Sequence, residues 1–253
     1  MALSDVLGPF NLHIWLCRSE RVASSAHFSR EILSRYASLT PHDWRFKLGD
    51  HGKPHIASEA IDLEFNLSHS RDWLACAVTG GCAVGVDIEY CQPEREFTKL
   101  ARRFFTQQEY EALKTMPAAE RCARFYDLWT LKEAKVKASG AALGNELPLL
   151  GFAVSNPATA CGASEPMQIR ELPAALSNRK IGASEAASEN TSAPEKRHYS
   201  LFNLPGNYRL ASCVHQARAG SPQVALFEWR GRDDVSPARY TVKACSTATQ
   251  CKG

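Results

Sequence analysis

Val84-Gly85-Val86-Asp87-Ile88-Glu89 alternates three β-branched apolar residues with a glycine and two acids. Successive side chains of a strand point to opposite faces, so this alternation predicts a strand with one face in the core. The carboxylates of Asp87 and Glu89 then project from the other face, about 6.5–7 Å apart along the strand. Because acidic residues are depleted in strands, the pair indicates a functional role. We expect a hard divalent cation there, bound to a phosphate-bearing ligand.

A second stretch, Trp129-Thr130-Leu131-Lys132-Glu133-Ala134-Lys135-Val136-Lys137, belongs to a helix predicted over about 120–138. Its apolar residues recur at helical spacing and give the helix a wide buried stripe. Glu133 lies beside this stripe, where an unpaired charge is costly. Taken alone, Glu133 forms an ordinary surface pair with Lys137, four residues on. Together with the two acids of the strand, it completes a set of three carboxylates suited to Mg²⁺.

Shorter patterns predict the remaining elements. Thr106 and Glu109 have the spacing of a capping box, which predicts the start of a helix. Residues 155–197 are dominated by small and polar residues, which predicts a poorly ordered insertion. The other predicted elements are a helix at 25–39 and strands at 11–16, 44–46, 65–70, 73–79, 199–204, 208–215 and 224–229.

Two further segments contain groups that suit an anionic ligand. Ser68 and His69, with Ser70 and Arg71 beside them, cluster donors that can hold an anionic oxygen. Lys53 precedes a proline, which favours an extended backbone and can aim the lysine at a ligand. Read singly, these are a structural histidine and a surface turn.

The composition indicates a globular protein and excludes several functional classes. With 253 residues, 44% hydrophobic and 23% charged, the chain can form one large domain or two fused halves. A net charge of +3 is too weak to indicate nucleic-acid binding. No apolar run approaches the ~20 residues of a membrane span, and we expect no secretory signal. Nine cysteines without a CxxC pair fit a reducing cytoplasm, and there is no P-loop, dinucleotide fingerprint or nucleophile elbow.

Together the motifs resemble the surfactin-type (Sfp-type) 4′-phosphopantetheinyl transferase family. The resemblance covers roughly residues 45–150, with a weaker echo at 199–215. It rests on four motifs in family order and spacing: Gly52-Lys53-Pro54, Phe65-Asn66-Leu67-Ser68-His69-Ser70, Gly85-Val86-Asp87-Ile88-Glu89, and Trp129-Thr130-Leu131-Lys132-Glu133-Ala134 with Lys137.

The resemblance implies an α+β fold of two pseudo-symmetric halves with the active site in the cleft between them. We expect an N-terminal half at 1–82 and a C-terminal half at 83–230, which contains the insertion at 155–197. A tail at 231–253 follows. The fused halves imply a monomer, and the expected location is the cytoplasm.

The resemblance also implies an activity. Such enzymes transfer the 4′-phosphopantetheine arm of coenzyme A to a serine of an apo acyl, peptidyl or aryl carrier protein, and release adenosine 3′,5′-bisphosphate. By similarity, Asp87, Glu89 and Glu133 hold Mg²⁺, Glu133 is the general base, and Lys137 neutralises or protonates the leaving phosphate. The groups expected on the coenzyme A phosphates are Lys53, Ser68, His69, Lys132 and Lys137.

Two alternatives remain open. A Mg²⁺-dependent nuclease also places two acids before an E-x-K motif, here Glu133 to Lys135. In that class the motif usually lies on a strand, whereas here the pattern is helical. The second alternative is a module that binds coenzyme A or a carrier protein without catalysis. The intact acids and Lys137 argue against it.

Overall fold

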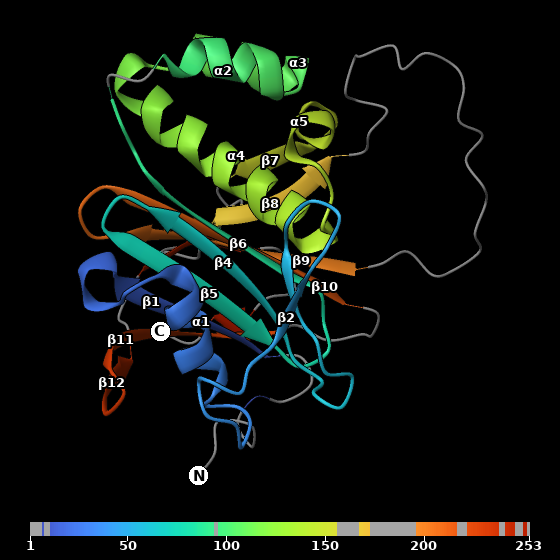
Figure 1. Cartoon of the computed structure of the whole chain (residues 1–253). Coiled ribbons are helices and arrows are strands. Elements are labelled where there is room, and N and C mark those ends of the chain that lie inside the picture. The colour runs from blue at the N-terminus through green and yellow to red at the C-terminus, as the bar shows by residue number, and fades with distance from the viewer. Residues whose placement is uncertain are drawn as a thin grey trace, which may run out of the picture.

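Two β-sheets packed face to face, each with a helix on its outer side, form an α+β fold (Figure 1). This is a computed structural model, which describes residues 7, 11–93, 96–155, 167–172, 196–216, 222–237, 241–245 and 250–251. The predicted α+β class is confirmed. Within these residues, no helix is long and apolar enough to cross a membrane.

The first sheet has the strand order β12-β11-β1-β5-β4, and β14 pairs with β11. Strand β1 is antiparallel to β5 and parallel to β11. A two-stranded sheet, β2-β3, stands apart from it. The bounds are β1 Leu12–Arg18, β2 Phe46–Leu48, β3 Pro54–Ile56, β4 Glu64–Ser70, β5 Trp73–Thr79, β11 Gln223–Gly231, β12 Asp234–Pro237 and β14 Gln250–Cys251, with helices η2 Ser19–Arg21 and α1 Ser25–Leu33.

The second sheet has the order β6-β10-β9-β13-β8-β7. Helix α4 lies across its outer face, and α2 and α3 lie above α4 (Figure 1). The bounds are β6 Val84–Tyr90, β7 Gly151–Ser155, β8 Met167–Leu172, β9 Lys196–Leu204, β10 Tyr208–Gln216 and β13 Thr241–Cys245, with α2 Phe97–Phe104, α3 Gln107–Thr115, α4 Ala118–Ser139, α5 Leu143–Glu146 and η3 Leu147–Leu149.

Among the residues that the structure describes, three buried clusters hold these layers together. One joins α1 to the first sheet and includes Phe28 and Trp15. The second lies between the sheets, and the third joins α4 to the second sheet through residues such as Leu131 and Ala211. The apolar residues of β6 all belong to the cluster between the sheets, namely Val84, Val86 and Ile88. The alternation predicted for this strand is therefore confirmed.

Gly85 marks the closest approach of α4 to β6. A β-carbon added to Gly85 would lie 1.9 Å from the carbonyl oxygen of Ala134 and 2.5 Å from the amide nitrogen of Ala138. Both distances are far inside van der Waals contact, so only glycine fits here. The missing side chain lets the helix backbone rest on the strand, beside the residues that follow Gly85.

Helix boundaries follow local signals in most places. The capping box is confirmed: Thr106 accepts the Glu109 amide, and the Glu109 carboxylate accepts the Thr106 amide. Helix α4 ends before Gly140, which has φ of +70°. The helix predicted at 25–39 is shorter, because the amides of residues 35 and 36 bond to carbonyls three residues earlier. Helix α2 was not predicted.

The chain passes from the first sheet to the second near the predicted boundary at residue 82. It then returns, because β11 pairs in parallel with β1. Strand β8 lies within the predicted insertion, and the rest of the insertion, apart from the ends of β7 and β9, falls outside the described residues. The predicted tail contributes three strands to the sheets, β12, β13 and β14.

Gly85→Ala tests the helix–strand contact. The added methyl group must push α4 away from β6, and we expect a loss of about 3 kcal/mol of unfolding free energy, at the upper end of overpacking costs. Urea unfolding measures it. Gly231→Ala is the matched control, because nothing lies within 4 Å of a β-carbon there. Equal unfolding midpoints for the two variants would contradict the contact.

Candidate functional site

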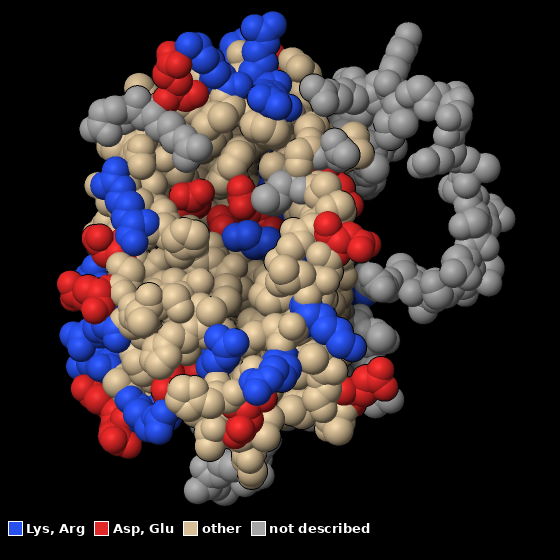
Figure 2. All heavy atoms as spheres, viewed as in Figure 1, with Lys and Arg blue, Asp and Glu red and all other residues tan. Residues whose placement is uncertain are grey.

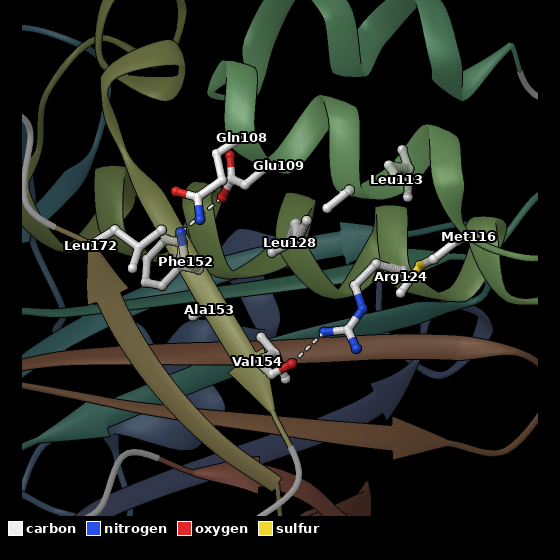
Figure 3. Close-up of a pocket in the computed structure, with 11 residues that line it drawn as sticks. Gln108, Glu109, Leu113, Met116, Arg124, Leu128, Phe152, Ala153, Val154 and Leu172 are labelled. Carbon is white, nitrogen blue, oxygen red and sulfur yellow. Dashed lines mark hydrogen bonds between the residues drawn. The ribbon is translucent and has the colours of Figure 1, made fainter. Parts of the chain in front are cut away.

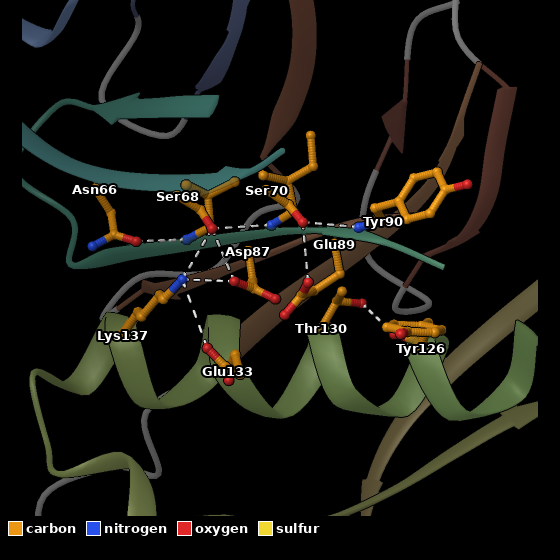
Figure 4. A network of polar contacts seen from close by, with 12 residues as sticks. Asn66, Ser68, Ser70, Asp87, Glu89, Tyr90, Tyr126, Thr130, Glu133 and Lys137 are labelled. Carbon is orange, nitrogen blue, oxygen red and sulfur yellow. Dashed lines mark hydrogen bonds and ion pairs between the residues drawn. The ribbon is translucent and has the colours of Figure 1, made fainter. Parts of the chain in front are cut away.

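Strands β4 and β6 end their respective sheets and pack against each other, and α4 packs on β6. Three side chains of β4, Asn66, Ser68 and Ser70, accept hydrogen bonds from the backbone of β6, and we call them the junction row (Figure 4). The three bonds run from Val86 N–H to Asn66 Oδ1 (2.9 Å), from Ile88 N–H to Ser68 Oγ (3.2 Å) and from Tyr90 N–H to Ser70 Oγ (3.0 Å). They tie the edges of the two sheets together.

Asp87 lies at the centre of the site and is only 2% exposed. Its Oδ1 accepts hydrogen bonds from Ser68 Oγ at 2.9 Å and Lys137 Nζ at 2.6 Å. Its Oδ2 is buried without a hydrogen-bond partner. Burial raises the pKa of the Asp87 carboxyl, and the Lys137 ammonium and Ser68 hydroxyl oppose that shift.

The other two predicted carboxylates flank Asp87. Glu89 follows it on the same face of β6, and its Oε2 accepts a hydrogen bond from Ser70 at 3.2 Å. Glu133 reaches the site from α4, with its Oε2 3.8 Å from Lys137 Nζ. Figure 4 shows the three carboxylates directed into the space between α4 and β6. In the space-filling view of Figure 2, acidic side chains gather near the middle of the visible face of the molecule, beside a basic side chain.

Lys137 forms ion pairs with two of these acids, Asp87 and Glu133. Burial alone would lower its pKa, but the carboxylates of Asp87 and Glu133, with a smaller effect of Glu89, raise the pKa above its usual value. The ammonium group therefore stays charged and serves as the counter-ion of Asp87.

The donor chemistry fits a hard cation. Carboxylate oxygens are the ligands that Mg²⁺ prefers, and the unpartnered Oδ2 of Asp87 lacks the partner that a buried charged oxygen normally has. In the arrangement observed, the described residues include no group of three His, Cys, Asp or Glu side chains close enough to hold a metal. Lys137 lies against Asp87 instead.

A cavity of about 550 Å³ opens beside these groups. Lys53 and Lys137 both line it. Lys53 Nζ donates to the carbonyl oxygens of Val84 (3.1 Å) and Ala138 (3.4 Å), and burial lowers its pKa. The full lining is Ser25, His51, Gly52, Lys53, Pro54, Asn66, Leu67, Val136, Lys137, Gly140, Ala141 and Ala142.

Ser68 and His69 lie on opposite faces of β4, because neighbouring strand residues alternate. Ser68 is buried against Asp87, whereas His69 is exposed. Strand β4 thus separates the two neighbouring residues that the sequence suggested as phosphate contacts.

Lys132 does not join the site, contrary to the prediction that it contacts coenzyme A phosphates. It is fully buried on another face of α4, where its Nζ lies 2.8 Å from Glu109 Oε2. It also donates to the carbonyl oxygens of Leu147 and Leu150. A step of one residue rotates a helix position by about 100°, which directs Lys132 away from Glu133.

Sequence reasoning missed two members of the junction row, Asn66 and Ser70. Their signal is a two-residue alternation of polar side chains through β4, with Ser68 between them. The residue types of this segment indicated a cluster of donors, but they did not indicate that these side chains would accept hydrogen bonds from the backbone of β6.

A second cavity, of about 240 Å³, lies between α3, α4 and the strands β7 and β8 (Figure 3). Its lining is mainly apolar, with Leu128, Phe152 and Leu172 among the residues in Figure 3. None of the predicted site residues lines it, so it does not enter the chemistry of the carboxylate site.

A model of the 4′-phosphopantetheinyl transferase superfamily matches residues 83–181. This range contains Asp87, Glu89, Glu133 and Lys137. The 4′-phosphopantetheinyl transferase HetI of Nostoc sp. strain PCC 7120 is 34% identical over 139 residues, which cover 54% of this chain and 59% of HetI.

The 4′-phosphopantetheinyl transferase Sfp of Bacillus subtilis is 38% identical over 125 residues, 49% of this chain and 53% of Sfp. The 4′-phosphopantetheinyl transferase AcpT of Salmonella typhimurium is 36% identical over 111 residues, 44% of this chain and 56% of AcpT. The chain therefore spans about half the length of the curated relatives it matches. The Sfp-type resemblance predicted from the four motifs is confirmed.

Lys132→Met tests the structural role of this lysine. The variant leaves the buried Glu109 carboxylate without its counter-ion, and we expect a loss of about 3 kcal/mol in urea unfolding. The double variant Lys132→Met/Glu109→Gln should recover part of that loss. Coenzyme A affinity, measured by calorimetry on folded protein, should not change. Unchanged stability with weaker coenzyme A binding would restore the original prediction.

Proposed function

We propose that this chain, a relative of the Sfp-type 4′-phosphopantetheinyl transferases, transfers the 4′-phosphopantetheine arm of coenzyme A to a serine of an apo acyl, peptidyl or aryl carrier protein. Adenosine 3′,5′-bisphosphate is released. One observation carries the proposal. Asp87 and Glu89 of β6 converge with Glu133 and Lys137 of α4 beside a cavity that also contains a second lysine, Lys53.

Two pseudo-symmetric halves, at 1–82 and 83–230, form the proposed architecture, with the active site between them. The topology supports this. In the first sheet a strand, a helix and two strands follow in the order β1, α1, β4 and β5, and the strands pair as β1-β5-β4. In the second, β6, α4, β9 and β10 follow in the same way, with β7 and β8 between α4 and β9, and pair as β6-β10-β9.

A monomer in a reducing cytoplasm is the proposed state. Fused halves supply both sides of the site within one chain, which supports the monomer. Three described cysteines support the compartment, because Cys17, Cys76 and Cys213 are buried free thiols.

Mg²⁺ is the proposed cofactor, held by Asp87, Glu89 and Glu133, where it would stabilise the charge that develops on the coenzyme A diphosphate. Lys137 Nζ donates to Oδ1 of Asp87 at 2.6 Å, so Oδ2, which is buried without a partner, is the oxygen that would hold the cation. The Lys137 ammonium would neutralise the charge of the phosphate that leaves.

Glu133 is the proposed general base. The carrier serine oxygen forms a bond to the phosphorus that bears the pantetheine arm, and the bond from that phosphorus to the bridging oxygen breaks. The serine proton passes to the Glu133 carboxylate, which is largely buried but reaches the site from α4. The bridging oxygen leaves with adenosine 3′,5′-bisphosphate.

Three more groups are proposed to bind coenzyme A phosphates, namely Lys53, Ser68 and His69. Lys53 is the best supported of them, since it lines the same cavity as Lys137. Ser68 lies 3.1 Å from Lys137 Nζ, and His69 is exposed on the neighbouring surface of β4.

The nuclease alternative is not favoured by the geometry. Its E-x-K motif falls within helix α4, and Lys135 lies 3.8 Å from Glu146 instead of facing the carboxylates of β6. An assay of transfer to an apo carrier protein distinguishes a non-catalytic binding module from a transferase.

Transfer itself is the first test. We expect the protein, incubated with coenzyme A, Mg²⁺ and an apo carrier protein, to add the mass of one phosphopantetheine group to the carrier, as measured by intact-protein mass spectrometry. A chelator should stop the gain. No gain on fatty-acid, polyketide or peptide carriers would refute the transferase, and coenzyme A binding without transfer would support the binding module.

Asp87→Asn and Glu133→Gln test the assigned roles. Each removes a carboxylate charge while keeping the side-chain shape, so kcat should fall about 10²–10⁴-fold, as expected for loss of a general base or a charged ligand. Circular dichroism should show the native fold. Glu111→Gln is the matched control, since this exposed acid on α3 pairs only with Lys114 among the ion pairs of the described residues. Near-normal turnover in either site variant would contradict its role.

A further inference from the structure

We propose that Ser70 is a positioning residue that fixes the Glu89 carboxylate from across the junction between the two sheets. Glu89 belongs to β6 of the second sheet, whereas Ser70 ends β4 of the first. The inference rests on the proposed function in one respect, namely that Glu89 is a metal ligand. It assigns a role to a residue that the four motifs contain but do not explain.

The hydrogen bonds of Ser70 leave one direction for its proton. Its Oγ lies 3.0 Å from the backbone nitrogen of Tyr90 and 3.2 Å from Glu89 Oε2. A backbone N–H can only donate, so the hydroxyl must accept there. A carboxylate can only accept, so the hydroxyl proton points to Glu89. The two contacts together set both the position of the oxygen and the direction of its proton.

The same arrangement recurs two residues earlier. Ser68 Oγ accepts the amide of Ile88 at 3.2 Å and donates to Asp87 Oδ1 at 2.9 Å. Each serine hydroxyl thus accepts a hydrogen bond from the backbone amide of one β6 residue. It donates a hydrogen bond to the carboxylate of the residue just before that one (Figure 4). The repeat follows the two-residue period of both strands, so the alignment of β4 with β6 positions both carboxylates at once.

A further contact anchors the end of the junction row. Arg71, directly after Ser70, has φ of +47°, and its guanidinium carbon lies 3.7 Å from the centroid of the Tyr90 ring. Positive φ is uncommon for a residue with a side chain. The cation–π contact holds the turn after β4 against Tyr90, the residue whose amide Ser70 accepts.

Removal of this hydroxyl should loosen Glu89 without removing any metal ligand. Groups that orient a metal ligand through a hydrogen bond typically change metal affinity 10–100-fold when lost. A purely structural serine would instead lower stability and leave metal affinity unchanged. Metal affinity therefore separates the two roles.

The test measures Mn²⁺ binding by electron paramagnetic resonance of the free ion, with Mn²⁺ alone and with coenzyme A present. We expect Ser70→Ala to weaken Mn²⁺ binding about 10-fold and Ser70→Thr, which keeps the hydroxyl, to stay close to the parent protein. Ser29→Ala is the matched control. Ser29 is a buried serine that donates to the carbonyl of Ala26 on α1 and should leave Mn²⁺ affinity unchanged.

A double-variant cycle isolates the contact. In a Glu89→Gln background, Ser70→Ala should have little further effect on Mn²⁺ affinity, because the group that it positions is already altered. Independent effects of the two changes, or unchanged affinity in Ser70→Ala alone, would overturn the proposal. If Ser70→Ala fails to fold, Ser70→Cys replaces it. Its weaker donor should still reduce affinity, and parent-like binding would overturn the proposal.

The readout does not depend on transfer to a carrier. If no carrier is modified but Mn²⁺ affinity still depends on Ser70, the proposed function fails and the positioning role stands. If transfer proceeds and Mn²⁺ affinity does not depend on Ser70, the positioning role of Ser70 is refuted and the proposed function stands.

Discussion

Helix α4 rests directly on strand β6 at Gly85, and the arrangement of the charged groups depends on that contact. With no β-carbon on Gly85, the backbone of the helix approaches the strand where Ala134 and Ala138 face it. Glu133 and Lys137, each one residue before these alanines, therefore come level with the acids of β6. Any larger residue at Gly85 would separate the two pairs.

Two of the buried ion pairs that involve α4, Lys132 with Glu109 and Lys137 with Asp87, differ in their hydrogen bonding. Glu109 and Lys132 satisfy each other, and the Glu109 carboxylate also accepts the backbone amides of Thr106 and Phe152. This pair ties α3, α4 and β7 together. Asp87 instead keeps one buried oxygen without a partner. An incompletely satisfied carboxylate is costly to bury, and that cost is consistent with a site that binds ligands rather than one that only holds the fold.

Much of the site was predictable because it depends on local periodicity. Alternation placed Asp87 and Glu89 on one face of β6, and helical spacing placed Lys137 one turn beyond Glu133. The prediction for Lys132 failed because it relied on adjacency in sequence and not on helical periodicity. Adjacency in sequence suggested a shared role with Glu133, but the rotation of the helix separates neighbours. The capping box at Thr106 was predictable because its bonds span three residues.

The sequence by itself determined which faces of β6 and α4 are apolar and which residue types could bind a phosphate with its cation. The tertiary structure alone decided that Asn66, Ser68 and Ser70 would bond to the backbone of β6, and that β11 would return to pair with β1. The physical reason is the distance along the sequence over which each interaction acts. Periods of two and 3.6 residues arise from local backbone geometry and mark the sequence directly. Hydrogen bonds between distant segments depend on which edges meet, and a single sequence carries no periodic trace of that.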